Sequence, residues 1–119
     1  LVYVTRLKKE TAYVARKRYS EMFKCLGVSD RVNSLLREGR MTKPTEVQEH
    51  CIPLILRGND VVACAETGSG ETAAFLIPIV QDLVADIKPY YCVIITPTRE
   101  LAYQIGEQAK DLLSSQNHA

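Results

Sequence analysis

Residues 60–75, DVVACAETGSGETAAF, constrain the fold more than any other part of the sequence. A compact run of small and β-branched apolar residues predicts a strand over 60–65 that is buried on both faces. Gly68 and Gly70 then allow a tight turn, and a long apolar segment predicts a helix over 70–86 in which Pro78 causes a kink or costs a backbone hydrogen bond. A strand, a glycine-rich turn and a helix in this order are the framework of a loop that binds phosphate through backbone N–H groups.

The side chains of this loop fit the phosphate-binding pattern G-x-x-x-x-G-K-[ST] only in part. Thr72 stands where a hydroxyl would coordinate a phosphate-bound Mg²⁺, but Ala65 replaces the first glycine and Glu71 replaces the lysine. On the loop alone, a nucleotide site and a simple glycine turn between a strand and a helix are equally good interpretations.

The rest of the chain supplies one more strand and several helices. Residues 91–97, YCVIITP, predict a second buried strand, and 98–115 predict an amphipathic helix. Upstream, Ser29 and Gly39 bound a short helix, and Pro53 divides the next helical segment into two short helices. The alternation predicts an α/β fold in which strands 60–65 and 91–96 are parallel neighbours or one strand apart. Because two strands do not make a stable parallel sheet, we expect further strands in a longer parent protein.

Composition adds weaker constraints. The net charge of the 119 residues is +1, but residues 1–22 hold six basic and two acidic side chains, so this basic N-terminal extension carries +4 and the remainder −3. Such an extension suits nucleic acid or an acidic partner, and a solvated helix face explains it equally well. No apolar run approaches membrane-spanning length, so no membrane partner is expected. The cysteines lack a C-x-x-C pair and are expected to be small buried thiols of an intracellular protein: Cys25, Cys51, Cys64 and Cys92.

Three short motifs occur in order along the chain. They are KPTEVQ (43–48) with IP after it, AETGSGET (65–72) and PTRELAYQ (97–104). With them, residues 23–113 resemble the first RecA-like domain of DEAD-box ATP-dependent RNA helicases. That family writes its loop A-x-T-G-x-G-K-T, so Ala65 is expected and only Glu71 departs. The resemblance implies a P-loop NTPase with a RecA-like parallel sheet, truncated to its first strands and helices, and a partial helicase domain over 23–119 that includes the Q motif.

The resemblance also implies roles for individual residues. Gln48 would read adenine, Phe23 would stack on the base, and Thr72 would meet Mg²⁺ through the nucleotide. The implied ATP-binding residues are Phe23, Gln48, Ala65, Glu66, Thr67, Gly68, Ser69, Gly70, Glu71 and Thr72. The residues implied to contact the RNA backbone are Pro97, Thr98, Arg99 and Glu100.

Structural alternatives accompany these roles. Thr45 and Gln48 form a T-x-x-Q capping box, which would only tie back the start of a helix. Phe23 could be a core residue, and Glu66 an exposed loop residue without chemistry. The chain also departs from the family where Arg40 and Met41 follow Gly39, since the family places a glycine at position 40 and an aromatic or aliphatic residue after it.

Two features indicate that the chain as given is inactive. No Asp-Glu dipeptide occurs, so the family's Asp-Glu-Ala-Asp motif is missing, as is the second RecA-like domain that would be a partner in the full-length protein. At an effective dielectric of about 20, a charge pair at about 4 Å is worth ~4 kcal/mol, so Glu71 in place of lysine would weaken phosphate binding strongly. Glu71 could lessen the repulsion by turning to solvent or by binding a proton.

The resulting expectation is part of an RNA-stimulated ATPase that binds ATP, Mg²⁺ and RNA in its lysine form. The alternative is a non-catalytic pseudo-ATPase scaffold or an RNA- or protein-binding module. A nuclear or nucleolar location is expected ahead of a cytoplasmic one.

Overall fold

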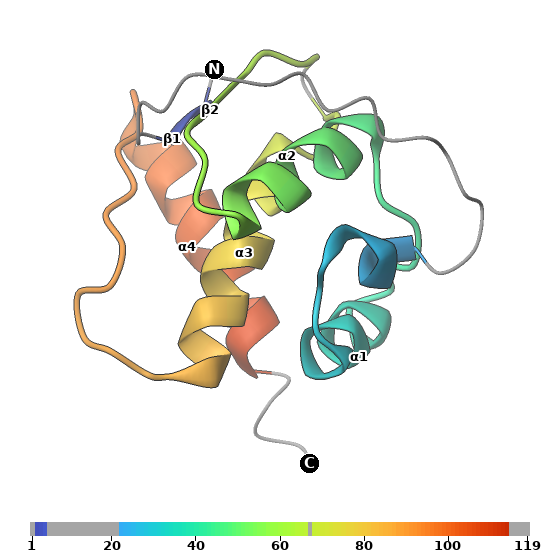
Figure 1. The fold of residues 1–119 in the computed structure, drawn as a ribbon. Coiled ribbons are helices and arrows are strands. Elements are labelled where there is room, and N and C mark those ends of the chain that lie inside the picture. Colours follow the sequence, from blue (N-terminus) through green and yellow to red (C-terminus); the bar gives the residue numbers. More distant parts are fainter. Residues whose placement is uncertain (1, 5–21, 67, 115–119) are drawn as a thin grey trace.

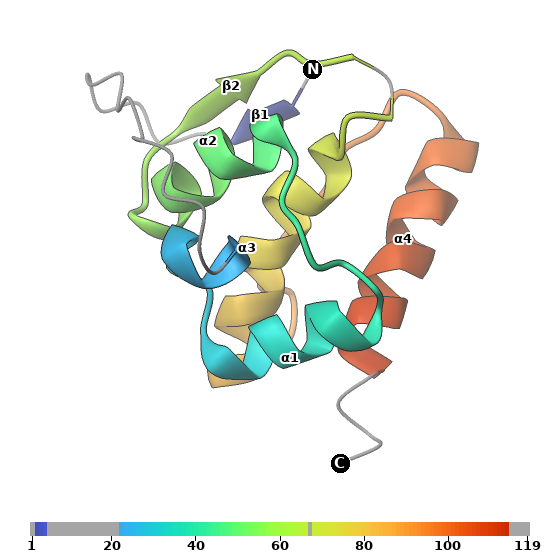
Figure 2. The same cartoon turned by 90° about the vertical axis from the view of Figure 1, so that its right-hand side faces the viewer.

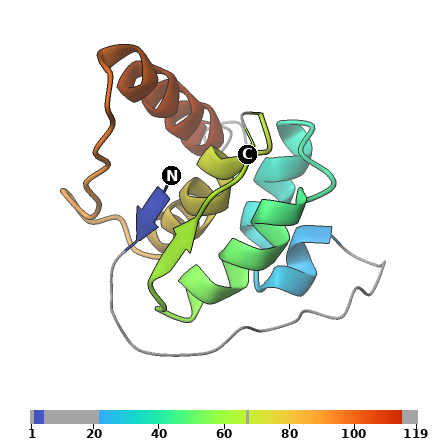
Figure 3. The same cartoon turned by 90° about the horizontal axis from the view of Figure 1, so that it is seen from above.

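The computed structural model describes residues 2–4, 22–66 and 68–114 (Figure 1). Its elements are β1 (Val2–Val4), the 3-10 helix η1 (Met22–Leu26), α1 (Asp30–Glu38), α2 (Glu46–Leu56), β2 (Val61–Ala63), α3 (Glu71–Ala85) and α4 (Arg99–Ser114). α3 lies in the middle and packs against α1, α2 and α4 (Figures 1 and 2). Seen from above, α2 and α4 lie on opposite sides of α3 (Figure 3). Among the described helices, none has the length and apolar character needed to cross a membrane.

The core forms on both sides of α3. Toward α1, α2 and η1, the largest cluster of buried residues consists of Phe23, Val28, Val32, Leu36, Ile52, Ala73 and Ile77. Toward α4, Phe75 and Leu76 pack with Ile105. The Gln81 side chain joins α3 to the turn before α1, because its Oε1 accepts from Ser29 N at 2.7 Å and its Nε2 donates to Gly27 O at 3.1 Å.

The predicted helix starts are confirmed, but the predicted break at Pro53 is wrong. Ser29 caps α1, since its Oγ accepts from Val32 N at 3.3 Å. α2 runs without interruption from Glu46 to Leu56 although it contains Pro53. α3 likewise continues through Pro78. Proline removes one backbone hydrogen bond from a helix, yet burial of Ile52 before Pro53 and packing of Leu54 and Ile55 after it favour a continuous helix.

The predicted parallel pair of strands is not present. β2 is shorter than expected and pairs antiparallel with β1, with Val2 opposite Ala63 and Val4 opposite Val61. Residues 91–96 form no strand, and Val93 and Ile95 are 83% and 91% exposed instead of buried. A strand needs a neighbouring strand to accept and donate its backbone hydrogen bonds, and none lies beside this segment in the described part of the chain.

The direction of the helices nevertheless agrees with a parallel α/β arrangement. α3 and α4 begin at the same end of the molecule and run the same way (Figures 1 and 2). The chain between them, residues 86–98, returns along the length of α3 to that end (Figure 1). Helices that follow successive parallel strands have this relation. Residues 91–96 thus run where a strand between α3 and α4 would run, but they form none of the hydrogen bonds of a strand.

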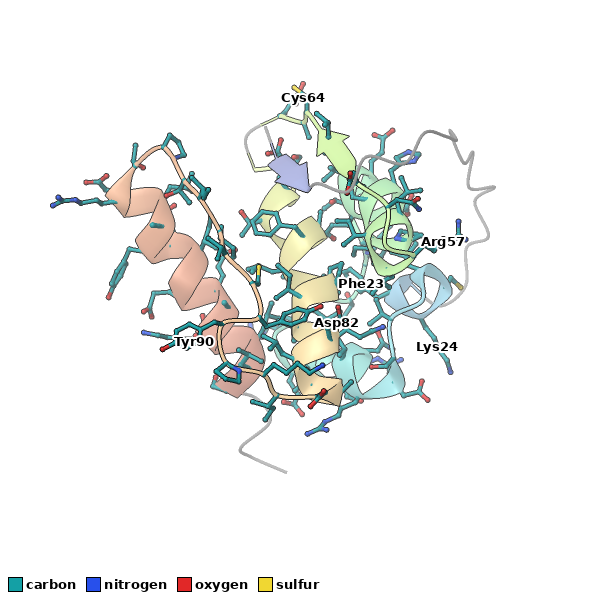
Figure 4. All side chains as sticks on the ribbon, turned by 60° about the vertical axis from the view of Figure 1, so that its left-hand side comes forward. Phe23, Lys24, Arg57, Cys64, Asp82 and Tyr90 are labelled. Atoms are coloured by element: carbon teal, nitrogen blue, oxygen red, sulfur yellow. The ribbon has the colours of Figure 1, made fainter. Side chains whose placement is uncertain are left out.

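The expectation that all four cysteines are buried is correct only for Cys51. Cys25, Cys64 and Cys92 are exposed, and Cys64 lies at the outer end of the β2 region (Figure 4). Cys92 is exposed because it belongs to the segment that forms no strand. Burial is the main cause that raises the pKa of the Cys51 thiol above its ordinary value.

α1 ends in a Schellman motif whose left-handed residue is Arg40. Arg40 N donates to Arg37 O at 2.9 Å, and Met41 N donates to Leu36 O at 2.7 Å. Arg40 has a φ of 61°, whereas Gly39 has an ordinary φ of −76°. Met41 packs against the core cluster, as the residue after the left-handed one commonly does in this motif. The motif explains why a glycine suits position 40 and an apolar residue suits position 41.

We therefore predict that Arg40→Gly stabilises the chain. Removing the side chain relieves the left-handed backbone by up to about 1 kcal/mol, after the larger entropy of an unfolded glycine is subtracted. Urea unfolding of the 119-residue chain measures this. Gly39→Ala is the matched control and should cause no loss, because a Cβ there meets nothing closer than 3.6 Å. A lower unfolding midpoint for Arg40→Gly would show that the arginine side chain matters more than the backbone.

Candidate functional site

The predicted loop lies between β2 and α3. Gly68 and Gly70 have φ values of 82° and 89°, a left-handed conformation that suits glycine. Gly70 is the N-cap of α3, and Ser69 N donates to Glu66 O at 3.1 Å within the turn. Backbone N–H groups and the positive end of the helix dipole therefore meet at this loop, which is the arrangement that attracts an anion.

Gln48 joins the start of α2 to the loop. Its Nε2 donates to Gly70 O at 3.2 Å, and its Oε1 accepts from Thr45 N at 3.0 Å. The side chain is only 3% exposed. The capping-box alternative is thus the arrangement observed, although the reciprocal contact to the Thr45 hydroxyl falls outside hydrogen-bond limits. Adenine reading by Gln48 stays a prediction, since in this conformation both ends of the amide are engaged within the protein.

Glu71 turns inward and not to solvent. Its Oε1 accepts from the backbone N–H of Ala65 at 2.8 Å, across the mouth of the loop. The carboxylate also lies near α2, because its charge is the second cause, after burial, that raises the pKa of the Cys51 thiol. The first residue of α3 thereby bonds the first residue of the predicted loop.

The other predicted nucleotide-binding residues occupy varied positions. Glu66 is exposed, while Ser69 and Thr72 are half-buried. Ser69 Oγ is buried and has no hydrogen-bond partner among the described residues. Thr67 lies outside the described residues. Thr72 is the second residue of α3, so its hydroxyl belongs to the helix turn behind the loop.

Phe23 is a core residue in this structure. Its ring is fully buried beside Val28 and Ile77, at the place labelled in Figure 4. No ring face is open to a base, so stacking on adenine would require the aromatic ring to leave the core. The structural alternative for Phe23 fits this conformation, and base stacking stays a prediction.

The residues predicted to contact RNA lie together at the start of α4. Pro97, Thr98, Arg99 and Glu100 are all exposed. Thr98 Oγ1 accepts from Leu101 N at 3.2 Å, so this hydroxyl caps the helix. Thr98 O in turn accepts from Thr96 Oγ1 at 2.8 Å. Since α3 and α4 start at the same end of the molecule, this group and the loop share that end (Figures 1 and 2).

Sequence reasoning missed the two contacts that shape the loop. The bond from Gln48 to Gly70 joins residues 22 positions apart, and no periodicity reports such a contact. The bond from Ala65 to Glu71 was missed because position 71 was compared with the lysine that usually stands there. In the described residues, no group of three or more His, Cys, Asp or Glu side chains could hold a metal.

The space at Gly70 generates a prediction about the loop. A Cβ at Gly70 would lie 2.5 Å from Gln48 Nε2 and 3.0 Å from Thr45 Oγ1, whereas a Cβ at Gly68 would meet nothing within 4 Å. Both positions carry a left-handed cost of about 1–2 kcal/mol for alanine. Gly70→Ala should lose about 1–3 kcal/mol more than Gly68→Ala in urea unfolding, because it also displaces Gln48. Equal losses would mean that the Gln48 amide moves aside without cost.

Comparison with known proteins places these features in a family. A family model described as DEAD/DEAH box helicase matches residues 45–119. The chain is 48% identical over 96 residues to the ATP-dependent rRNA helicase RRP3 of Yarrowia lipolytica, and 51% identical over 87 residues to the human probable ATP-dependent RNA helicase DDX49. These matches cover 81% and 73% of this chain but 20% and 18% of the relatives, so the chain spans about a fifth of their length.

Solved structures give the same assignment. The RNA helicase Prp28 from Chaetomium thermophilum, bound to ADP, matches with a TM-score of 0.71 and 31% identity over 78% of this chain and 24% of that chain. A DEAD box protein from Methanococcus jannaschii matches with a TM-score of 0.64 and 36% identity, over 77% of this chain and 25% of that chain. These likenesses confirm the RecA-like α/β fold class despite the strand that does not form here. Because the family model matches more than half of the 119 residues, the chain belongs to the DEAD/DEAH box helicase family.

Proposed function

We propose that this chain is part of the first RecA-like domain of an ATP-dependent RNA helicase, with an ATP-binding loop whose cation is replaced by Glu71. The observation that carries the proposal is the loop itself: two left-handed glycines at the N-terminus of α3, directly after β2. Residues 23–119 would belong to the ATP-binding domain, and 1–22 would be a basic extension. The Asp-Glu-Ala-Asp motif and the second domain would come from other parts of a longer protein.

Nucleotide and RNA are the proposed ligands. Prp28 is bound to ADP, and the match to Dbp5 of S. cerevisiae, at 25% identity and a TM-score of 0.61, is to a complex with RNA and ADP BeF3. In this chain the backbone of residues 65–70 would cradle the phosphates, Thr72 would meet Mg²⁺, and Gln48 would select adenine. The exposed start of α4 would contact the RNA backbone through Arg99 and its neighbours.

The backbone of the loop is suited to bind an anion, but the Glu71 side chain is not. Gly68, Gly70 and the start of α3 supply donors and a favourable dipole. Glu71 adds a negative charge where a phosphate would lie, and it already holds the Ala65 N–H. The form with Glu71 should therefore bind nucleotide weakly, and without an Asp-Glu-Ala-Asp motif the chain alone should not hydrolyse it.

A process and a location are proposed from the relatives. One of the most similar relatives is named as an rRNA helicase. Action on ribosomal RNA, in the nucleolus, is accordingly the proposed role of the longer protein.

A non-catalytic scaffold is the second candidate function. The Glu71 contact with Ala65 N favours it, because a loop that is closed by its own side chain keeps the fold without nucleotide. Such a protein would bind RNA or a protein partner through the same exposed surface of α4. Nucleotide binding after restoration of the lysine separates the two functions.

We predict that Glu71→Lys restores binding of Mg²⁺-ADP. The change removes a repulsion and supplies an attraction at the same phosphate oxygens, which should tighten the Kd by about a hundredfold or more. Thermal shift measures this, because a ligand of the native state raises the apparent stability. Turnover should remain absent.

Glu38→Lys is the matched control for this prediction. It makes the same change of charge on an exposed residue at the end of α1, outside the loop, and it should leave ADP binding weak. In the Glu71→Lys background, Gln48→Ala should reduce the preference for ADP over pyrophosphate. If the unaltered chain binds ADP as tightly as the lysine variant, the electrostatic account of Glu71 is wrong.

We predict that Arg99→Ala weakens binding to single-stranded RNA. The side chain is exposed at the start of α4, and loss of one phosphate contact should reduce the salt slope of log K by about 1. Fluorescence anisotropy at several salt concentrations measures it. Lys110→Ala removes the same charge near the far end of α4 and is the control. Equal salt slopes for the two variants would remove Arg99 from the RNA surface.

A further inference from the structure

The Glu71 carboxylate occupies a donor that the loop would otherwise offer to a ligand. Its Oε1 lies 2.8 Å from Ala65 N, a typical length for a hydrogen bond to a charged oxygen. Ala65 is the first residue of the loop and Glu71 the first residue of α3, so this one bond spans the loop. The five residues between donor and acceptor are thereby closed into a ring.

The surroundings of the carboxylate favour this closed arrangement. Glu71 borders a cavity of about 10 Å³, and the other residues that line it are Val47, Cys51, Ile55, Val61, Ala63, Ala74 and Phe75. All of these are apolar apart from the thiol of Cys51, whose pKa is raised first by burial and then by the nearby Glu71 charge. A cavity of this size holds at most about one water, so on this side of half-buried Glu71 the bond to the backbone N–H is favoured over solvation.

We propose that Glu71 is an internal ligand of the loop, which holds it closed in the absence of nucleotide. The proposal rests on the proposed nucleotide site and concerns its regulation. An incoming phosphate must displace a carboxylate that is tethered beside its donor, at an effective concentration of about millimolar or higher. A lysine at position 71 cannot form this bond, because an ammonium group has no acceptor.

Position 71 therefore controls both whether the Ala65 N–H is occupied in the empty loop and whether the charge at the loop attracts or repels phosphate. With glutamate the Ala65 N–H is occupied without ligand. With lysine the Ala65 N–H is free and the charge attracts phosphate. This differs from simple charge repulsion, which would weaken nucleotide binding without stabilising the empty loop.

Two variants of the 119-residue chain separate these accounts. Glu71→Gln removes the charge but keeps an oxygen that can accept from Ala65 N, whereas Glu71→Ala removes both. Amide hydrogen exchange, followed residue by residue by NMR, should show Ala65 N exchanging about tenfold faster or more in Glu71→Ala, with Glu71→Gln between that variant and the unaltered chain. The amide of Ile77, in the fully buried part of α3, should be unchanged and reports whether each variant is folded.

Binding of Mg²⁺-ADP to the same variants completes the test. If the side chain at position 71 occupies the Ala65 N–H, Glu71→Ala should gain more affinity for Mg²⁺-ADP than Glu71→Gln, because glutamine can still accept from that N–H. Equal gains would assign the whole effect to charge and overturn the internal-ligand proposal, as would equal exchange of Ala65 N in all three proteins. If none of them binds ADP and Glu71→Lys does not bind it either, the proposed nucleotide function fails, and the exchange of Ala65 N still decides whether Glu71 closes the loop.

Discussion

Burial of α3 between Ala73 and Val80 is the constraint on which the rest of the structure depends. The helix carries an almost continuous buried stretch from Ala73 to Val80. Such a helix has no polar face to leave in water, so α1, α2 and α4 must surround it. Its N-terminus is consequently held against the start of α2, where Gln48 bonds Gly70 O. The path of the glycine loop is thus set by helix packing, before any ligand is present.

Both departures from the family pattern suit the local structure better than they suit the family's chemistry. Arg40 accepts a left-handed backbone so that α1 can end in a Schellman motif and Met41 can reach the core. Glu71 places a negative charge in the first turn of α3, where the helix dipole stabilises it by about 0.3–1 kcal/mol. The same glutamate that repels a phosphate is therefore favourable for the empty protein.

Sequence patterns predicted the helices better than the sheet or the contacts of the site. Ser29, Gly70 and the apolar spacing of residues 70–86 predicted α1 and α3 closely, because capping and burial are local properties. The apolar run at 91–97 reports a tendency to be buried in a sheet, but it cannot report whether a neighbouring strand is present. Pro53 was treated as a helix breaker, although packing on both sides of it outweighs one lost hydrogen bond.

The site was predicted in its parts and not in its connections. The loop glycines, the start of α3 and the Arg99 group were all predicted from the sequence, and the structure describes each of them. Thr67 is the one predicted site residue that lies outside the described residues. Phe23 and Gln48 are buried, because tertiary contacts that the sequence does not display engage them in the core and the loop.

The exposed segment at 91–95 has a consequence for the behaviour of this chain in solution. Val93 and Ile95 are in water, and no strand among the described residues pairs with this segment. Apolar segments with unpaired backbone groups are the ones that associate with other chains. Residues 91–95 are therefore a segment through which two copies of the 119-residue chain would associate, by forming the backbone hydrogen bonds that each segment lacks.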